Sequence, residues 1–300
     1  MKQSDTKPKI IVVLGSTASG KSDLAVFLAK KFNGEIISAD SRQVYKGMDI
    51  GSAKITKKEM AKIPHYLLDV ANPRTQFSVN CYQKLANQAI KKIIAKNKLP
   101  IICGGTGLYI DAVINDVQFP NIPPSPTLRK KLEKLSTKEL FEKLNKLDPG
   151  YAKKIDKNNP RRLIRALEII IISGKPMPEL VKNAKFNTIK IGLKKDLPEL
   201  KKKITQRTKQ RIKKGMISEV KNLHKQGLSW KRLFDFGLEY RYLSLYLQKK
   251  IAENEMINSI NKSSIQYAKR QMTWFKRDPN IKWIKNRQGA EKTVRSFLKN

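Results

Sequence analysis

The chain has 300 residues, 40% of them hydrophobic and 7% aromatic, which is enough to bury a sizeable core in one large domain or two. It carries 63 lysines and arginines against 25 aspartates and glutamates, a formal net charge of +38. A charge of this size indicates a polyanionic partner such as nucleic acid. Lysine, asparagine and isoleucine are all abundant, as in proteins of AT-rich genomes, so part of the lysine is expected to be solvated surface.

Several classes of protein are excluded at this stage. No apolar run approaches the roughly 20 residues needed to span a bilayer, and the polar stretch 1–9 resembles neither a signal peptide nor a transit peptide. We therefore expect a cytoplasmic protein without a membrane partner. Cys81 and Cys103 lack a CxxC partner, so both are expected to be buried small hydrophobes and not a disulfide. His65 and His224 are too far apart in the chain to build a zinc site with them.

The first part of the chain has the pattern of a βαβ protein. Apolar residues at 9–14 predict a strand, and helical periodicity at 23–32 predicts the helix that follows it. Strands are also predicted at 35–38 and 99–103, with a helix at 79–97 between them. This order favours a parallel sheet with right-handed crossovers, in which ligands bind at the carboxyl ends of the strands.

The remainder of the chain is predicted to be mostly helical. The proline-rich stretch 120–126 marks the start of a helical insertion, with helical periodicity at 127–146 and 160–173. Residues 197–226 predict a basic helix pair or one long basic helix, and the C-terminal third continues with helices.

The loop after the first strand fits the P-loop pattern GxxxxGK[ST]. Its backbone N–H groups and the helix N-terminus would bind a phosphate or diphosphate, Lys21 would neutralise the anion, and the Ser22 hydroxyl would bind Mg²⁺. The alternative is a tight glycine turn that binds nothing. The residues predicted to bind the diphosphate are Gly15, Ser16, Thr17, Ala18, Ser19, Gly20, Lys21 and Ser22.

These patterns predict an α/β fold with a P-loop NTPase-like parallel sheet core, a helical insertion domain and a mostly helical C-terminal part. We place the first part of the core at residues 1–115 and the insertion at 116–195. The C-terminal part, at 196–300, is expected to complete the core.

Two further motifs follow predicted strands. Asp40 ends the run EIISAD and is expected to face the P-loop across the top of the sheet. Three roles remain open for it: Mg²⁺ ligand, general base or helix N-cap. Thr106, in the GGTG turn at 104–107, either donates to the same anion or serves only the turn. The NKLD run at 145–148 matches the guanine-reading motif of GTPases, but it follows a charged helix and not a buried strand, so we attribute it to chance.

Residues 266–278 combine basic and aromatic side chains, including Lys269, Arg270, Tyr267 and Trp274. Basic groups for phosphates beside aromatic faces for stacking are typical of RNA recognition. The alternative is an amphipathic helix that buries its aromatic residues in the core.

Five segments, in order and spacing, resemble the tRNA dimethylallyltransferases. They are GSTASGKS, SADSRQVYKGMDIGSAK at 38–54, GGTGLYI at 104–110, PRRLIRALEI at 160–169 and YAKRQMTWFKRD at 267–278. The second segment is far more specific than the P-loop, which many unrelated enzymes share. The resemblance extends over nearly the whole chain.

This resemblance implies that the P-loop binds dimethylallyl diphosphate with Mg²⁺, and that the dimethylallyl group moves to N6 of the adenosine immediately 3′ of the anticodon. Asp40 would be the general base, while Lys21 and Thr106 would stabilise the departing diphosphate. The enzyme would be a monomer, with the insertion over the anticodon stem-loop and the adenine flipped out of its stack. By similarity, the residues that contact tRNA are Asp40, Ser41, Arg42, Gln43, Thr106, Arg161, Arg162, Arg165, Lys269, Arg270, Gln271, Trp274 and Lys276.

Three other functions fit part of the sequence. A P-loop kinase of small metabolites would leave the basic, aromatic helix unexplained, and an adenylate isopentenyltransferase acting on free nucleotides would not need so positive a chain. An RNA-binding protein with an inactive P-loop would not need Lys21, Ser22, Asp40 and Thr106 together.

Overall fold

The structure is a computed structural model that describes residues 7–299. It has two compact units: unit 1 consists of Met1–Asp116 and Ala184–Asn300, and unit 2 of Val117–Asn183. Most of the polar stretch 1–9 lies outside the described residues. Within residues 7–299, no helix is long and apolar enough to cross a membrane.

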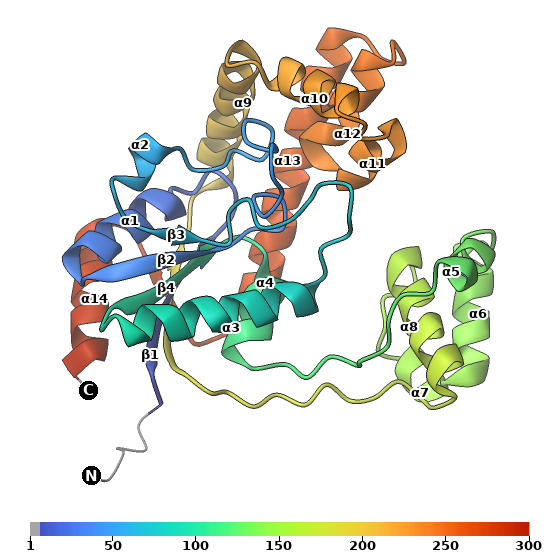
Figure 1. Ribbon diagram of the computed structural model, residues 1–300, viewed down its shortest axis with the longest axis horizontal. Coiled ribbons are helices and arrows are strands. Elements are labelled where there is room, and N and C mark those ends of the chain that lie inside the picture. Colours follow the sequence, from blue (N-terminus) through green and yellow to red (C-terminus); the bar gives the residue numbers. More distant parts are fainter. Residues whose placement is uncertain (1–6, 300) are drawn as a thin grey trace. The chain divides into compact units, whose positions relative to one another are not determined.

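Unit 1 is built on a parallel sheet of six strands in the order β3-β2-β4-β1-β5-β6. Figure 1 shows this sheet among the helices of the unit. The strands are β1 (Lys9–Gly15), β2 (Gly34–Ala39), β3 (His65–Tyr66), β4 (Leu99–Gly104), β5 (Asn187–Leu193) and β6 (Ile281–Ile284). The predicted parallel sheet is therefore confirmed, and so are the three strands expected from the sequence. Strands β3, β5 and β6 were not predicted.

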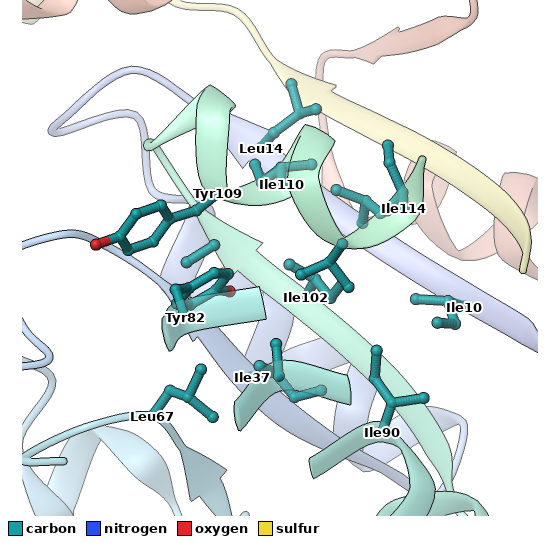
Figure 2. Packing of buried hydrophobic residues seen from close by; sticks show 14 of the residues in the cluster. Ile10, Leu14, Ile37, Leu67, Tyr82, Ile90, Ile102, Tyr109, Ile110 and Ile114 are labelled. Carbon is teal, nitrogen blue, oxygen red and sulfur yellow. The ribbon is translucent and has the colours of Figure 1, made fainter. Parts of the chain in front are cut away.

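The helices of unit 1 are α1 (Lys21–Lys31), α2 (Lys57–Met60), α3 (Val79–Ala95), α4 (Gly107–Ile114), α9 (Leu197–Lys213), α10 (Met216–Lys225), α11 (Trp230–Phe236), α12 (Leu238–Leu247), α13 (Glu253–Phe275) and α14 (Arg287–Lys299). Some of them cover the two faces of the sheet. Ile10 and Val12 of β1 pack in one cluster with residues of α3 and α4, which Figure 2 shows from close by. Ile11 and Val13 pack in another with residues of α1 and α14. A strand buried on both faces reads as a continuous apolar run, which is why β1 shows no alternation.

A third cluster joins the C-terminal helices to the loop after β2. Val44 and Met48 of that loop pack with buried residues of α10, α11, α12 and α13. The basic segment predicted at 197–226 is a helix pair, because Gly215 between α9 and α10 has a φ of 95°, outside the helical range.

Unit 2 is a group of four helices with its own apolar cluster. They are α5 (Pro126–Leu132), α6 (Thr137–Leu147), α7 (Pro149–Ala152) and α8 (Pro160–Ser173). Unit 2 ends at Asn183, whereas the range predicted for the insertion runs to residue 195. That range therefore includes β5, which pairs with β1 from Lys9–Asn187 to Gly15–Leu193 and so belongs to the sheet of unit 1.

The two cysteines are both free, as predicted, but only one is buried. Cys103 lies in β4 within the core, whereas Cys81 is exposed, so the prediction of a buried Cys81 was wrong. The buried side of α3 is formed by residues such as Tyr82, Ala86 and Ile90, and Cys81 lies outside that stripe.

Candidate active site at the carboxyl ends of β1, β2 and β4

The P-loop connects the end of β1 to the start of α1. Gly20, the N-cap of α1, has a φ of 91°, a conformation that favours glycine. Among the described residues no side chain caps this helix, so N–H groups of its first turn have no partner within the helix. Together with the helix dipole, such N–H groups form an anion-binding site.

Lys21 lies in this anion-binding site, and no carboxylate of residues 7–299 is bonded to it. Its ammonium Nζ donates to the backbone carbonyl of Ser16 at 3.3 Å. Burial lowers the pKa of Lys21; the nearby Asp40 carboxylate opposes this decrease and the Arg207 guanidinium adds to it. An arriving anion would therefore meet a partly desolvated cation, where an electrostatic attraction is stronger than at the surface.

Asp40 follows β2 directly and is partly exposed. Its Oδ1 accepts the backbone N–H groups of Arg42 at 2.8 Å and Gln43 at 3.3 Å. Within residues 7–299, no hydrogen bond reaches Oδ2. Oδ1 thus caps the turn that follows, and Oδ2 is available to a substrate. The capping role considered from the sequence is therefore compatible with a role as general base or metal ligand.

Thr106 ties the Asp40 loop to the end of β4. Its Oγ1 accepts the N–H of Ser41 at 3.1 Å, and its own N–H donates to the carbonyl of Ala39, also at 3.1 Å. Tyr267, on α13, lies close to Thr106, Gln271 and Asp40. Burial, with the Asp40 charge nearby, raises the pKa of Tyr267 to about 12. Tyr267 therefore carries a neutral hydroxyl beside Asp40.

Gln271 joins two of the phosphate-site loops. The N–H of Thr17 donates to its Oε1 at 2.8 Å, and its Nε2 donates to the carbonyl of Gly105 at 2.9 Å. Gln271 is only 6% exposed. Both ends of its amide are occupied inside the protein, so this structure gives Gln271 a part in building the site, whereas the resemblance implied a contact with tRNA.

Arg207, on α9, is a site residue that the sequence analysis missed. Burial lowers the pKa of this arginine, as does Arg211, while Glu239 and Asp40 act in the opposite direction. It donates no hydrogen bond to any residue within 7–299. Its position could have been inferred from helical spacing: Arg207 comes three residues after the buried Ile204 and four before the buried Arg211, next to the buried side of α9. Because α9 contains many other basic residues, the sequence alone does not single out Arg207.

The other residues predicted to contact tRNA on unit 1 differ in exposure. Lys269, Arg270 and Lys276 are exposed on or next to α13. Trp274 is partly buried against the core, and its Nε1 donates to Oδ2 of Asp111 at 2.9 Å. Of the two readings of this segment, an amphipathic helix packing its aromatic residues inward describes Trp274 better than a base-stacking surface does.

Arg42 is also held within the protein. Its Nε donates to the carbonyl of Phe236 at 2.9 Å and its guanidinium lies 5.8 Å from the centre of the Phe236 ring. These contacts fix the loop that begins at Asp40 against the end of α11.

The three predicted arginines of unit 2 lie on α8. Arg161 and Arg162 are exposed in its first turn. Arg165 instead donates to Oε2 of the fully buried Glu168 at 2.6 Å and to the carbonyl of Ile122 at 2.8 Å. Arg165 thus stabilises unit 2 itself.

Comparison with known proteins gives a consistent result. A family model described as IPP transferase matches residues 43–278. A tRNA dimethylallyltransferase from Anoxybacillus flavithermus is 45% identical over 280 residues, 92% of this chain and 90% of the relative. The same name belongs to a Thermoanaerobacter protein that is 44% identical and covered, like this chain, over 97% of its length.

Solved structures agree with the sequence relatives. The tRNA isopentenylpyrophosphate transferase of Bacillus halodurans superposes with a TM-score of 0.74 at 36% identity, over 98% of this chain and 97% of that one. A eukaryotic dimethylallyltransferase described as acting on tRNA gives 0.78 at 27% identity, over 92% of this chain and 73% of that one. The resemblance seen in the five sequence segments is confirmed, and the chain belongs to the IPP transferase family.

Proposed function

We propose that this protein transfers a dimethylallyl group from dimethylallyl diphosphate to N6 of the adenosine immediately 3′ of the anticodon in tRNA, releasing diphosphate. One observation carries the chemistry: an uncapped helix N-terminus with Lys21 and Arg207 lies beside a carboxylate that has one unbonded oxygen. The names of the relatives support the two substrates.

The diphosphate binds at the start of α1. The N–H groups of the P-loop and the cations of Lys21 and Arg207 surround it, and these donors are in place before the reaction. Charge on the diphosphate grows as the allylic C–O bond breaks, so fixed donors favour the transition state over the ground state. Thr106 contributes its hydroxyl from the next loop.

Asp40 takes the proton of the acceptor. The N6 lone pair of adenine forms a bond to the allylic carbon, the bond from that carbon to the diphosphate oxygen breaks, and the diphosphate leaves with the electron pair. The extra proton on N6 passes to Oδ2 of Asp40. A positioned general base typically contributes a factor of about 10²–10⁴ to the rate.

The tRNA binds through exposed basic side chains. Lys269, Arg270 and Lys276 of unit 1 and Arg161 and Arg162 of unit 2 are solvent-accessible and suit phosphate contacts. Such contacts position the RNA, whereas the groups around Asp40 select the base. A free nucleotide offers few phosphates to a chain with a net charge of +38, which favours a macromolecular acceptor.

Mg²⁺ accompanies the diphosphate. Among the described residues, no group of three His, Cys, Asp or Glu side chains could hold a metal, so a dedicated protein cage for the ion is not formed there. The exposed Ser22 hydroxyl in the first turn of α1 fits an ion whose other ligands are substrate oxygens and water, as Mg²⁺ prefers. When bound, the ion neutralises charge on the diphosphate.

The test is acceptor choice. The purified protein is incubated with labelled dimethylallyl diphosphate and Mg²⁺ together with tRNA, AMP or ATP. We expect label in tRNA only, at the adenosine following the anticodon, and none after that adenosine is changed to guanosine. Labelled AMP or ATP would favour an adenylate isopentenyltransferase, and phosphorylation of a small molecule by ATP would favour a kinase.

A further inference from the structure

We propose that Glu219 and Arg211 are positioning residues for the transfer reaction: they clamp the backbone of residues 49–51 and so hold the loop of Asp40 at a set distance from Arg207. The proposal rests on the proposed function, because its activity readout is prenyl transfer. It is carried by a set of contacts that lie away from the reacting groups.

Glu219 of α10 binds three successive backbone N–H groups. Asp49 and Ile50 donate to Oε2 at 2.8 and 2.5 Å, and Gly51 donates to Oε1 at 2.9 Å. The Tyr240 hydroxyl donates to Oε1 at 3.0 Å. Hydrogen bonds to an ionised carboxylate are shorter and stronger than neutral ones, so this side chain holds three residues in one conformation.

Arg211 of α9 binds the same segment through its carbonyls. Its Nε donates to the carbonyl of Ile50 at 2.6 Å, and its guanidinium also donates to the carbonyl of Gly51. A third bond runs from Nη1 to Oε1 of Glu239 at 2.8 Å. The side chain is nearly buried, at 9% exposure for the residue. The planar arginine fork suits this arrangement in a way that lysine cannot match.

Close packing around Gly51 restricts the position of the 49–51 backbone. A Cβ added at Gly51 would lie 2.5 Å from Cζ of Tyr240 and 3.0 Å from Oε1 of Glu219. The backbone therefore approaches the clamp as closely as only glycine permits. We infer that the segment is fixed in place and does not merely touch the two helices.

The clamped segment is connected to Asp40 through Gln43. Ala53 donates its N–H to the carbonyl of Ile50 at 3.1 Å, so the segment continues in a compact turn. Nε2 of Gln43 donates to the carbonyl of Ala53 at 3.2 Å, and the N–H of Gln43 donates to Oδ1 of Asp40 at 3.3 Å. A shift at residues 49–51 is thus passed to the carboxylate through three hydrogen bonds.

The other end of the clamp leads to the diphosphate site. Arg207 lies four residues before Arg211, about one helical turn away on α9. Because Arg211 bonds to residues 50 and 51, α9 and the Asp40 loop cannot move independently. The clamp therefore sets the spacing between the base and a cation of the diphosphate site.

The main test uses Glu219→Gln, which keeps the side-chain size but places an amide NH₂ against backbone donors. We expect kcat for tRNA prenylation to fall by about 10–100-fold, the range expected for a small misplacement of reacting groups. The KM for dimethylallyl diphosphate should change little. Hydrogen exchange should show faster exchange at the amides of residues 49–51, a readout independent of activity. Arg211→Lys, which keeps the charge but loses the fork, should act in the same direction.

Two matched variants separate positioning from loss of stability. Tyr240→Phe removes one bond to the same carboxylate but leaves the three backbone bonds. Glu35→Gln disturbs an equally engaged carboxylate at the other end of β2. Both should lower thermal stability while leaving kcat of the folded enzyme near the wild-type value.

The outcomes are distinguishable. A wild-type protein that does not prenylate tRNA would overturn the proposed function, whereas the exchange experiment still tests the clamp. With an active wild type, unchanged kcat in Glu219→Gln and Arg211→Lys, or a loss no larger than in Glu35→Gln, overturns the inference. If Glu219→Gln does not fold, Arg211→Lys decides the question by the same two measurements.

Discussion

A carboxylate lies at each end of strand β2, and the two differ in their exposure and in the groups that bind them. Glu35, near the start of the strand, is 1% exposed and accepts the Tyr66 hydroxyl at 2.6 Å. Lys96 and Lys98 also bind it, at 3.2 and 3.0 Å. Asp40, just after the strand, is partly exposed. Lys21 and Arg207 act on it electrostatically, and neither forms an ion pair with it in the described part of the chain.

This difference indicates that Glu35 stabilises the fold, whereas Asp40 is available to react with a substrate. At Glu35 two lysines and a tyrosine hydroxyl bind the carboxylate directly, so its charge is compensated within the protein. At Asp40, among residues 7–299, backbone N–H groups alone bind the carboxylate, and they bind only its Oδ1. Lys21 and Arg207 are therefore able to bind an anionic ligand. A parallel sheet offers ligands its carboxyl edge, and the open cluster lies at that edge.

The largest expected effect comes from exchanging each carboxylate for its amide. Asp40→Asn should lower kcat for prenyl transfer by about 10²–10⁴-fold, because the amide cannot accept the proton, while tRNA binding is largely kept. Glu35→Gln should leave kcat unchanged. Single-turnover rates and filter binding would measure the two quantities. Equal losses in the two variants would remove the distinction between the two ends of β2.

The next effect concerns Lys21 and Arg207, the two cations proposed to bind the diphosphate. Lys21→Ala and Arg207→Ala should each weaken binding of inorganic diphosphate by about 10–100-fold, since hydrogen bonds to charged groups contribute about 1.5–3 kcal/mol. Lys190→Ala is the matched control, because Lys190 is already paired with Asp278 at 2.6 Å. Calorimetric titration would report all three. If Arg207→Ala binds as tightly as Lys190→Ala, Arg207 does not belong to the diphosphate site.

Much of this arrangement was predictable from local sequence. The strands β1, β2 and β4 are apolar runs followed by turn residues, and the P-loop and Asp40 follow them directly, so their common edge could be inferred. Strand β5 was missed because Lys190 interrupts its apolar pattern. Lys190 is paired with Asp278, which lies 88 residues further along the chain, so local sequence does not reveal this partner.

The rest of the site depends on contacts that sequence patterns do not reveal. Arg207 and Tyr267 reach the site only because α9 and α13 pack together, and no local feature marks their direction. Gln271 and Arg165 were expected to face tRNA, yet the first bridges two loops and the second binds Glu168. A polar side chain in a motif can serve the ligand or the scaffold, and only its partners tell which.

On α8, two exposed arginines can be compared with one that is bonded to a buried carboxylate. Replacing Arg161 and Arg162 together by Ala should flatten the log–log salt dependence of tRNA affinity by about one to two units, since each phosphate contact contributes roughly 0.7–0.9. Arg165→Ala should leave the slope unchanged and lower the stability of unit 2, because Glu168 loses a partner. Binding measured over a salt series tests both. A flattened slope in Arg165→Ala would mean that this arginine reaches RNA despite its bonds.

The smallest effect is one of stability and concerns the occupied end of β2. Burial alone would raise the pKa of Glu35, but the hydrogen bonds from Tyr66, Lys98 and Lys96 outweigh it and hold the pKa below its usual value. A carboxyl group with a lowered folded-state pKa stabilises the fold fully at pH values above its unfolded pKa. That contribution is lost as the pH falls through the folded-state pKa.

The stability difference between the wild type and Glu35→Gln should therefore be largest near neutral pH and should shrink as the solution is acidified below the usual carboxyl range. Urea midpoints measured for both proteins from neutral to acidic pH test this. A difference that grows on acidification would mean that Glu35 is not the ionised centre of its cluster, and the contrast with Asp40 would then rest on exposure alone.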